Sequence, residues 1–198
     1  MKITTEQGKG GRLNIFADGE FIFSIESVVW YDYHIFDGDE VDEDTLDEIK
    51  SESVRRRCLN SALNILTGRA HSRRELSDKL RRKYDADACE YALNKAEDMG
   101  FIDDYDFAIS YAKELNENKF FSPCRIKNEL FAKGVDRNII TQVLDEIEID
   151  IIGNIKKVIE RKYLDCADDE KSMRRMIAGL QRLGYSYSDI KEAIGSER

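Results

Sequence analysis

A short pattern recurs three times in the chain at fifty-residue intervals: a serine, an apolar residue four positions later, and a leucine four positions after that. Apolar residues four apart lie on one face of a helix. Serine is a preferred helix N-cap because its hydroxyl accepts hydrogen bonds from the N–H groups of the first turn. Each copy is therefore predicted to be a helix that begins after its serine. The copies read SRRELSDKL (72–80), SPCRIKNEL (122–130) and SMRRMIAGL (172–180), with Ser72, Ser122 and Ser172 as the caps.

Neighbouring residues strengthen the prediction of these helices. Glu75 follows Ser72 by three positions, which is the spacing of a capping box. Pro123 occupies the first helical position of the second copy, where a missing N–H costs nothing. Gly134 and Gly184 are placed to end the second and third copies.

Helical apolar spacing also surrounds each copy. It predicts a helix before each serine and another after each stop, so that the unit has three helices; the preceding helices are expected at 53–67, 104–118 and 151–163. Repeats that cannot bury their apolar faces alone stack on their neighbours. The predicted fold is mainly α: a tandem array of three three-helix repeats of about 50 residues each, with a small N-terminal β-hairpin plus helix region. The predicted domains are 1–51, 52–100, 101–149 and 150–198.

The N-terminal residues follow a different period. The segments RLNIFAD and FIFSIES flank Asp18-Gly19, a two-residue signal for a tight hairpin turn. Further on, the range 37–48 contains eight acidic residues and no basic one. Asp42 suits a helix N-cap there, because acids are favoured at the positive end of a helix. Two short helices are therefore expected between the hairpin and the first repeat.

Composition restricts the class of protein. With 41% hydrophobic and 36% charged residues, the 198-residue chain is expected to be globular and soluble. It has no apolar run of membrane-spanning length, and its first ten residues lack a signal-peptide core, so a cytoplasmic location is expected. Cys58, Cys89, Cys124 and Cys166 are widely spaced, which favours reduced thiols over a disulfide framework or a zinc site.

No catalytic motif is present in the sequence. The two histidines, His34 and His71, lie in no pattern with serine or cysteine that predicts a hydrolase. Asp103, Asp104 and Asp106 could be paired catalytic carboxylates, but they are better explained as cap and first-turn acids of the helix that follows. The chain is therefore expected to have no enzymatic activity and no cofactor.

Charge is divided unevenly along the chain. The net charge of −9 is carried by residues 1–50, which hold 4 basic and 13 acidic side chains, whereas residues 51–198 hold 27 of each. Within the neutral part, residues 53–83 contain ten Lys or Arg and only Glu75 and Asp78, a local charge of +8. A basic patch of this kind can attract an anionic partner.

Two interpretations of the basic residues remain open. Arg74 with Asp78, Glu75 with Lys79, and Asp78 with Arg82 are four apart, so an ordinary salt-bridged solvent face is one of them. The other is contact with phosphates or with an acidic protein surface, because basic residues are in excess after this pairing. The candidate binding residues are Arg73, Arg74, Lys79, Arg81, Arg82, Arg174, Arg175 and Arg182.

An ordered series of motifs resembles the bacterial RecX family, the regulatory proteins that act on the RecA recombinase. The series consists of SRRELSDKL, then MGFIDDYDFAISYA (99–112), then SPCRIKNELFAKGVD (122–136). The resemblance covers roughly residues 53–195 and is thinner in the third repeat. Ser122 stands where the family often has glycine, and Lys83-Tyr84 lacks the Lys-Gly of the later turn.

The resemblance implies a monomeric, non-enzymatic modulator. Family members bind the RecA filament on single-stranded DNA, bridge neighbouring protomers and block filament growth, ATPase activity and strand exchange, with possible direct contact to DNA. The alternative from the residues alone is a stand-alone helical DNA-binding module resembling a transcription factor, favoured by the +8 segment.

Overall fold

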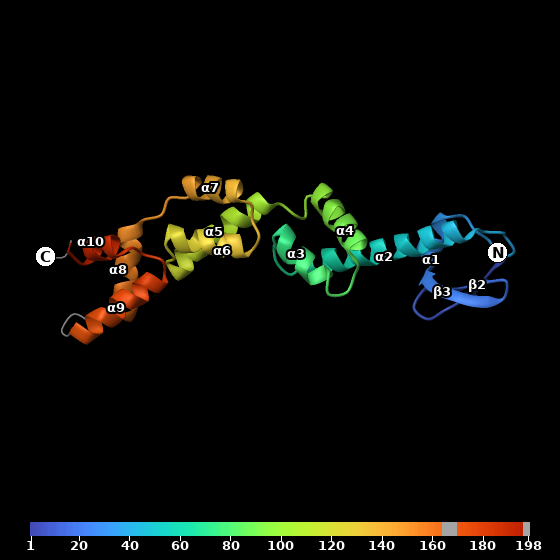
Figure 1. Ribbon diagram of the computed structural model, residues 1–198, viewed down its shortest axis with the longest axis horizontal. Helices are drawn as coiled ribbons and strands as arrows, with labels where there is room; N and C mark the ends of the chain where they lie inside the picture. Colours follow the sequence, from blue (N-terminus) through green and yellow to red (C-terminus); the bar gives the residue numbers. More distant parts are fainter. Residues whose placement is uncertain (164–169, 196–198) are drawn as a thin grey trace. The chain divides into compact units, whose positions relative to one another are not determined.

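The computed structural model describes residues 1–163 and 170–195. The chain divides into two compact units, Met1–Arg69 with Leu76–Phe101, and Ala70–Glu75 with Ile102–Arg198. Figure 1 follows the chain from its N-terminal strands through the helices that make up most of both units. The prediction of a mainly helical chain with a small β-containing N-terminus is therefore confirmed.

The first unit begins with a three-stranded antiparallel sheet in the order β1-β2-β3. Its strands are β1 (Ile3–Gln7), β2 (Arg12–Ala17) and β3 (Glu20–Glu26). The predicted hairpin is β2-β3, and Asp18 in its turn has a left-handed φ of 51°. The sequence did not predict β1, whose five residues ITTEQ include Ile3 as their one apolar side chain.

Two helices follow the sheet, and the second is much longer than predicted. These are α1 (Ser27–Asp32) and α2 (Glu43–Leu66), and Asp42 caps α2 as expected by accepting a 2.7 Å hydrogen bond from the Thr45 N–H. The expectation of two short helices before the first repeat is wrong for α2, which runs through 24 residues without a break. No glycine or proline interrupts this stretch, so nothing ends the helix locally.

Helix α2 also buries side chains at both ends of its length. Near its start, Leu46 and Ile49 complete the core that the sheet forms with α1 around Trp30. Further along, Cys58 and Ala62 are buried where α2 packs against α4 (Ala86–Asp98). Helix α3 (Arg73–Leu80) lies between α2 and α4 in the sequence, and its first three residues belong to the second unit.

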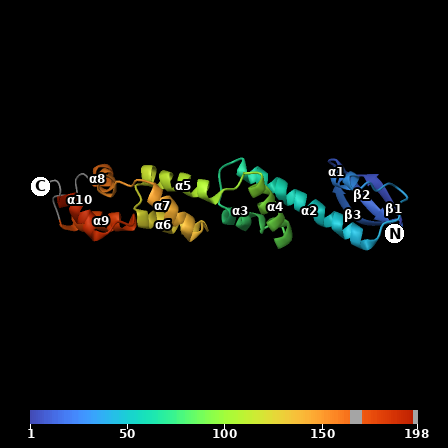
Figure 2. The same ribbon diagram turned by 90° about the horizontal axis from the view of Figure 1, so that it is seen from above.

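The second unit contains two groups of three helices. Figure 2 shows α5, α6 and α7 packed together, followed by α8, α9 and α10. Their bounds are α5 (Asp104–Lys119), α6 (Pro123–Ala132), α7 (Arg137–Glu146), α8 (Ile151–Lys162), α9 (Glu170–Arg182) and α10 (Tyr187–Gly195). Each group encloses its own apolar cluster, including Leu115, Ile126, Leu130 and Ile140 in the first and Ile155, Leu180, Tyr185 and Ile190 in the second.

Two of the three predicted serine caps are confirmed. The Ser72 hydroxyl accepts from the Glu75 N–H at 3.1 Å, and the Ser122 hydroxyl accepts from the Arg125 N–H at 3.2 Å. The prediction for Ser172 is wrong, because α9 begins at Glu170 and places Ser172 inside its first turn. An acid at the start of α9 suits the positive helix end, so the helix does not need the serine as its cap.

In the second unit, each of the two capping serines also contacts the end of the corresponding helix in the next repeat. The Ser72 hydroxyl donates to the Lys133 carbonyl at 2.6 Å, and the Ser122 N–H donates to the Leu183 carbonyl at 3.0 Å. Each of these carbonyls directly precedes a predicted stop glycine, Gly134 or Gly184. Both contacts join a capping serine to the carbonyl before a stop glycine, with the hydroxyl as donor in the first and the backbone N–H in the second. The positions of the two contacts repeat with the period of the sequence pattern.

Phe120 ties the two helical groups of the second unit together. It follows α5 with a left-handed φ of 54°, and its side chain joins the apolar cluster of α8–α10. The buried Tyr185 hydroxyl donates to the Phe120 carbonyl at 2.7 Å. Burial raises the pKa of Tyr185 well above its ordinary value, so this hydroxyl stays protonated and able to donate.

Candidate functional site

Three arginines of the basic segment in the first unit form ion pairs within that unit. On α2, Arg55 contacts Asp87 at 2.8 Å and Arg56 contacts Glu52 at 2.7 Å, while Arg57 lies 3.9 Å from Glu26. These cations are held by carboxylates of their own unit. They are therefore poor candidates for binding a partner.

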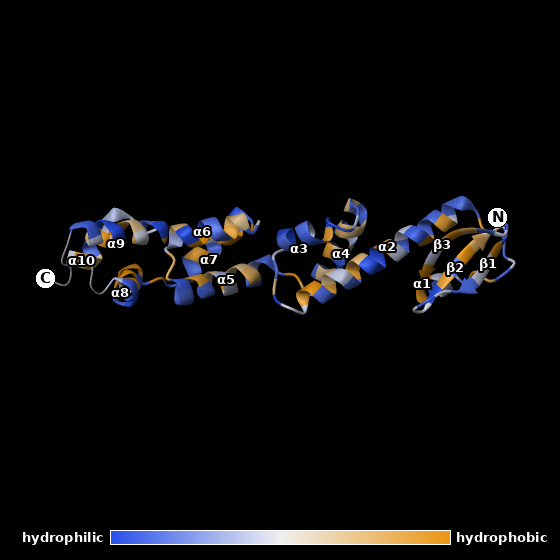
Figure 3. Cartoon of the chain, turned by 90° about the horizontal axis from the view of Figure 1, so that it is seen from below, coloured by the Kyte–Doolittle hydropathy of each residue, from blue (hydrophilic) through white to orange (hydrophobic). Residues whose placement is uncertain are grey.

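The end of α3 presents cations of a different kind. Leu76 and Leu80 are buried, as the spacing predicts, and Lys79, Arg81 and Arg82 are exposed. Helix α3 is mostly hydrophilic in colour in Figure 3. Within the described parts of the chain, neither Arg81 nor Arg82 forms an ion pair, so both guanidinium groups can contact a partner.

The salt-bridged interpretation of this face is only partly supported. Asp78 makes no ion pair with Arg74 or Arg82 among the residues that the structure describes. Glu75 contacts the Lys133 ammonium group at 2.5 Å. The two ion pairs predicted for Asp78 are therefore not formed.

Arg73 and Arg74 have structural contacts at the start of α3. The Arg73 N–H donates to the Asp104 carboxylate at 2.7 Å. The stem of Arg74 lies so close to Gly134 that a Cβ added to that glycine would come within 2.5 Å of the Arg74 Cβ. Both residues belong to the second unit, whereas Lys79, Arg81 and Arg82 belong to the first.

The candidate residues of the third repeat lie on α9. Arg174 pairs with Glu170 one turn earlier, and both side chains are highly exposed. Arg175 and Arg182 are exposed and form no ion pair in the described part of the chain. The structure thus leaves Arg175 and Arg182 as the stronger candidates on this helix.

The second unit holds a cationic group that the sequence patterns did not identify. Lys119 at the end of α5 and Lys157, Arg161 and Lys162 on α8 surround the rings of Phe120 and Phe121. The spacing of Lys157 and Arg161 by four residues and the sequence Lys-Phe-Phe are signals that could have located it. Their convergence, however, depends on tertiary packing.

The predicted capping acids and thiols have structural roles. Asp103 accepts from the N–H groups of Tyr105 and Asp106 at 2.8 and 3.0 Å, so its interpretation as a cap is confirmed. Cys58 and Cys89 are buried, and burial raises the pKa of the Cys58 thiol to about 12, so that this thiol stays protonated near neutral pH. Cys166 lies outside the described residues.

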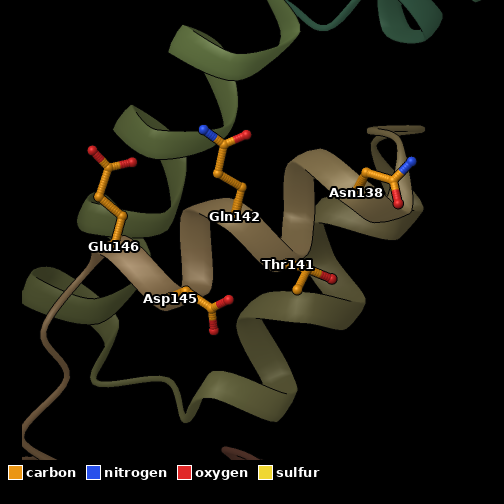
Figure 4. Close-up of a pocket in the computed structure, with 5 residues that line it drawn as sticks. All are labelled: Asn138, Thr141, Gln142, Asp145 and Glu146. Carbon is orange, nitrogen blue, oxygen red and sulfur yellow. The ribbon is translucent and has the colours of Figure 1, made fainter.

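A shallow depression covers the outer face of α7. Its lining consists of Asn138, Thr141, Gln142, Asp145 and Glu146. Figure 4 shows these side chains spread along the helix without converging on one point. Glu146 is occupied by a hydrogen bond from the Tyr105 hydroxyl. The arrangement lacks the convergent groups that a catalytic site requires.

The described residues contain neither a cluster of metal ligands nor a membrane-spanning helix. Within residues 1–163 and 170–195, no three His, Cys, Asp or Glu side chains gather as metal ligands. No helix in those ranges combines the length and apolarity needed to cross a membrane. The exposed cations are therefore the features that point most clearly to a binding function.

Three family models match the chain in order. Residues 2–42 match the N-terminal domain of the regulatory protein RecX, residues 58–95 its first three-helix domain, and residues 103–144 its second three-helix domain. The matched residues make up more than half of the chain. The proposed domain boundaries at residues 51, 100 and 149 remain predictions.

Curated relatives and solved structures agree with these matches. A protein named Regulatory protein RecX from Listeria monocytogenes serovar 1/2a is 35% identical, with the alignment covering 100% of this chain and 76% of the relative. One from Clostridioides difficile is 25% identical over 98% of this chain and 92% of its own. A crystal structure of regulatory protein RecX shares the fold with a TM-score of 0.71 at 24% identity, covering 96% of this chain and 98% of that one. The crystal structure of RecX from Lactobacillus salivarius is 26% identical and has a TM-score of 0.59, with the alignment covering 72% of this chain and 96% of that one.

Proposed function

The chain belongs to the RecX family, and we propose that it is a non-enzymatic regulator that binds the RecA filament on single-stranded DNA. Binding lowers the filament's ATPase activity, strand exchange and growth, and so regulates recombination and DNA repair in the cytoplasm. One observation carries the proposal: three RecX domain models match the chain in order, and the relatives of the chain are named regulatory proteins. The protein acts as a monomer without a cofactor.

The exposed cations support binding to such a filament. A filament assembled on DNA carries a dense row of phosphates, and cations without internal partners are attracted to it most strongly. Arg81 and Arg82 in the first unit and Arg175 and Arg182 in the second have this property. Repeated helix groups also provide several separate contact surfaces along one chain.

We expect the purified protein, at substoichiometric ratios, to reduce ATP hydrolysis by RecA on single-stranded DNA. Capture of one filament region affects the growth of the subunits beyond it, so fewer regulator molecules than RecA molecules suffice. The measurement is an ATPase titration with filament length followed in parallel by electron microscopy. Unchanged turnover and unchanged length at equimolar protein would refute the proposed function.

Charge reversal at the end of α3 should weaken this inhibition. Replacing Arg81 and Arg82 with glutamate is expected to raise the half-inhibitory concentration by about 10-fold or more, because attraction becomes repulsion at the interface. The matched control carries Lys113→Glu and Lys191→Glu, two exposed cations elsewhere whose reversal changes the net charge equally.

Circular dichroism should show equal helix content in the α3 variant and its control. If the folded α3 variant inhibits like the control, α3 is not the contact surface. A loss confined to an Arg175→Glu, Arg182→Glu variant would then place the contact on α9.

A second candidate function is that of a stand-alone DNA-binding module. The exposed Arg81 and Arg82 that follow α3 favour it, and the acidic range 37–48 disfavours it because that segment repels phosphate. Tight duplex binding without RecA, with preference for one sequence over random competitor, would support this alternative. Equal binding to all sequences would count against it.

A further inference from the structure

A pocket in the second unit lies where the ends of α5, α8 and α9 meet. Its lining includes Lys119, Phe120, Phe121, Arg161, Lys162 and Leu183. We propose that this pocket binds a phosphodiester group of single-stranded nucleic acid. The inference rests on the proposed function and locates a direct contact with single-stranded nucleic acid at residues separate from the α3 and α9 candidates.

The lining is strongly cationic. Lys119, Arg161 and Lys162 are exposed, and none of them forms an ion pair in the described part of the chain. Among the residues that the structure describes, no aspartate or glutamate lines the pocket. An anion that enters it meets three donors that are not already held by an internal carboxylate.

Two aromatic rings hold these cations in place. The Arg161 guanidinium lies 4.6 Å from the centre of the Phe120 ring, and the Lys119 ammonium lies 5.8 Å from that of Phe121. Cation–π contact restricts long side chains without neutralising their charge. Phe120 is itself fixed by the hydrogen bond from the Tyr185 hydroxyl to its carbonyl. The donors therefore lose less conformational entropy when an anion binds.

Helix dipoles alone do not account for the local charge. Lys119 lies in the last turn of α5, and Arg161 and Lys162 lie in the last turn of α8, where cations offset the negative helix ends. Each helix end contributes a charge of about −0.5, so two ends cancel about one of the three positive charges. About two positive charges remain for a ligand.

The equivalent position one repeat earlier is neutralised. There, Lys133 pairs with Glu75 at 2.5 Å and its ammonium lies 5.6 Å from the Tyr111 ring. Fifty residues later, Leu183 replaces Lys133 and Arg125 replaces Glu75. Arg125 pairs with Glu129 at 2.6 Å one turn further along α6, and it is not among the residues that line the pocket. The carboxylate that neutralises Lys133 in the earlier repeat therefore has no counterpart at position 125 beside Lys119, Arg161 and Lys162.

Single-stranded nucleic acid fits this chemistry better than an acidic protein segment does. Sites for single strands combine cations that follow the backbone with aromatic side chains near the unstacked bases. The pocket has both, with Phe121 half-buried at its edge and Arg125 lying 5.5 Å from that ring. An acidic peptide would use the cations but would gain nothing specific from the rings.

The test measures binding of a fluorescein-labelled dT20 oligonucleotide by anisotropy, with the full chain and without RecA. Reversal of Lys119 and Arg161 to glutamate should weaken binding by about 10-fold or more and reduce the slope of log K against log salt by about 1.4, the loss of two single-strand phosphate contacts. The control is the Lys113→Glu, Lys191→Glu variant, which carries the same net charge and should bind nearly as wild type. A Lys119→Gln, Arg161→Gln variant keeps the side-chain stems if charge reversal disturbs folding.

Three results with dT20 and the peptide would overturn the inference, and a fourth result, with inorganic phosphate, would do so as well. The first three are the absence of dT20 binding by the wild type at 50 mM salt, equal weakening in the pocket and control variants, and a poly-glutamate peptide that competes as well as unlabelled dT20. Inorganic phosphate should compete only at far higher concentration; competition as effective as that of dT20 would assign the pocket to a free anion instead. Since RecA is absent, a failure here leaves the ATPase titration, and with it the proposed function, to be judged separately.

Discussion

Replacing Gly184 with alanine is expected to lower the free energy of unfolding by about 3 kcal/mol, the sum of backbone strain and overpacking. Gly184 has a φ of 91°, which costs a residue with a side chain about 1–2 kcal/mol. An added Cβ would also overlap the Ser122 hydroxyl and lie 2.8 Å from the Arg125 Cβ. Atoms this close to the α6 backbone cannot move aside without shifting the start of that helix.

Gly100 provides the matched control for this substitution. Its φ of 74° is also left-handed, but a Cβ added there meets nothing within 4 Å. Gly100→Ala should therefore cost only about 1 kcal/mol, from backbone strain alone. The measurement is urea denaturation followed by far-ultraviolet circular dichroism. If both variants lower the free energy of unfolding equally, overlap with Ser122 and Arg125 adds no cost at Gly184, and the close approach at the repeat junction does not require a glycine.

Features determined by local signals were predictable from the sequence. The caps at Ser72 and Ser122 and the helix ends at Gly134 and Gly184 depend on side chains within a few residues, and the structure has all four. Ser172 was misplaced because the same pattern occurs inside a helix that had already begun. A cap motif therefore identifies a helix more securely than it identifies the helix's first residue.

Features that depend on distant partners were missed. Strand β1 contains a single buried apolar residue, Ile3, so its alternation is too weak to read, and it exists because it pairs with β2. Likewise, Lys119 and Arg161 are 42 positions apart and meet only through the packing of α5 and α8. Because these cations are far apart in the sequence, the count of charges along the chain identified the basic segment around α3 and missed the pocket.

Replacing Phe120 with alanine should destabilise the second unit by about 3 kcal/mol or more, as is usual for a buried phenylalanine. Its ring is 7% exposed and belongs to the apolar cluster of α8–α10, although the residue directly follows α5. Truncation would open a cavity between the two helical groups and remove the ring beneath Arg161. The left-handed backbone at this position would remain as strained as before, because alanine gains nothing there.

Phe131 is the control for the loss of an aromatic ring. It lies on the same unit but is 52% exposed, so Phe131→Ala should change stability by less than about 1 kcal/mol. Phe120→Leu, which keeps most of the buried volume, should fall between the two. Denaturation midpoints in that order would show that Phe120 joins two repeats whose caps alone do not hold them together. Equal midpoints for Phe120→Ala and Phe131→Ala would instead mean that the hydrogen bonds from Ser122 and Tyr185 suffice, and that the ring serves mainly to position Arg161.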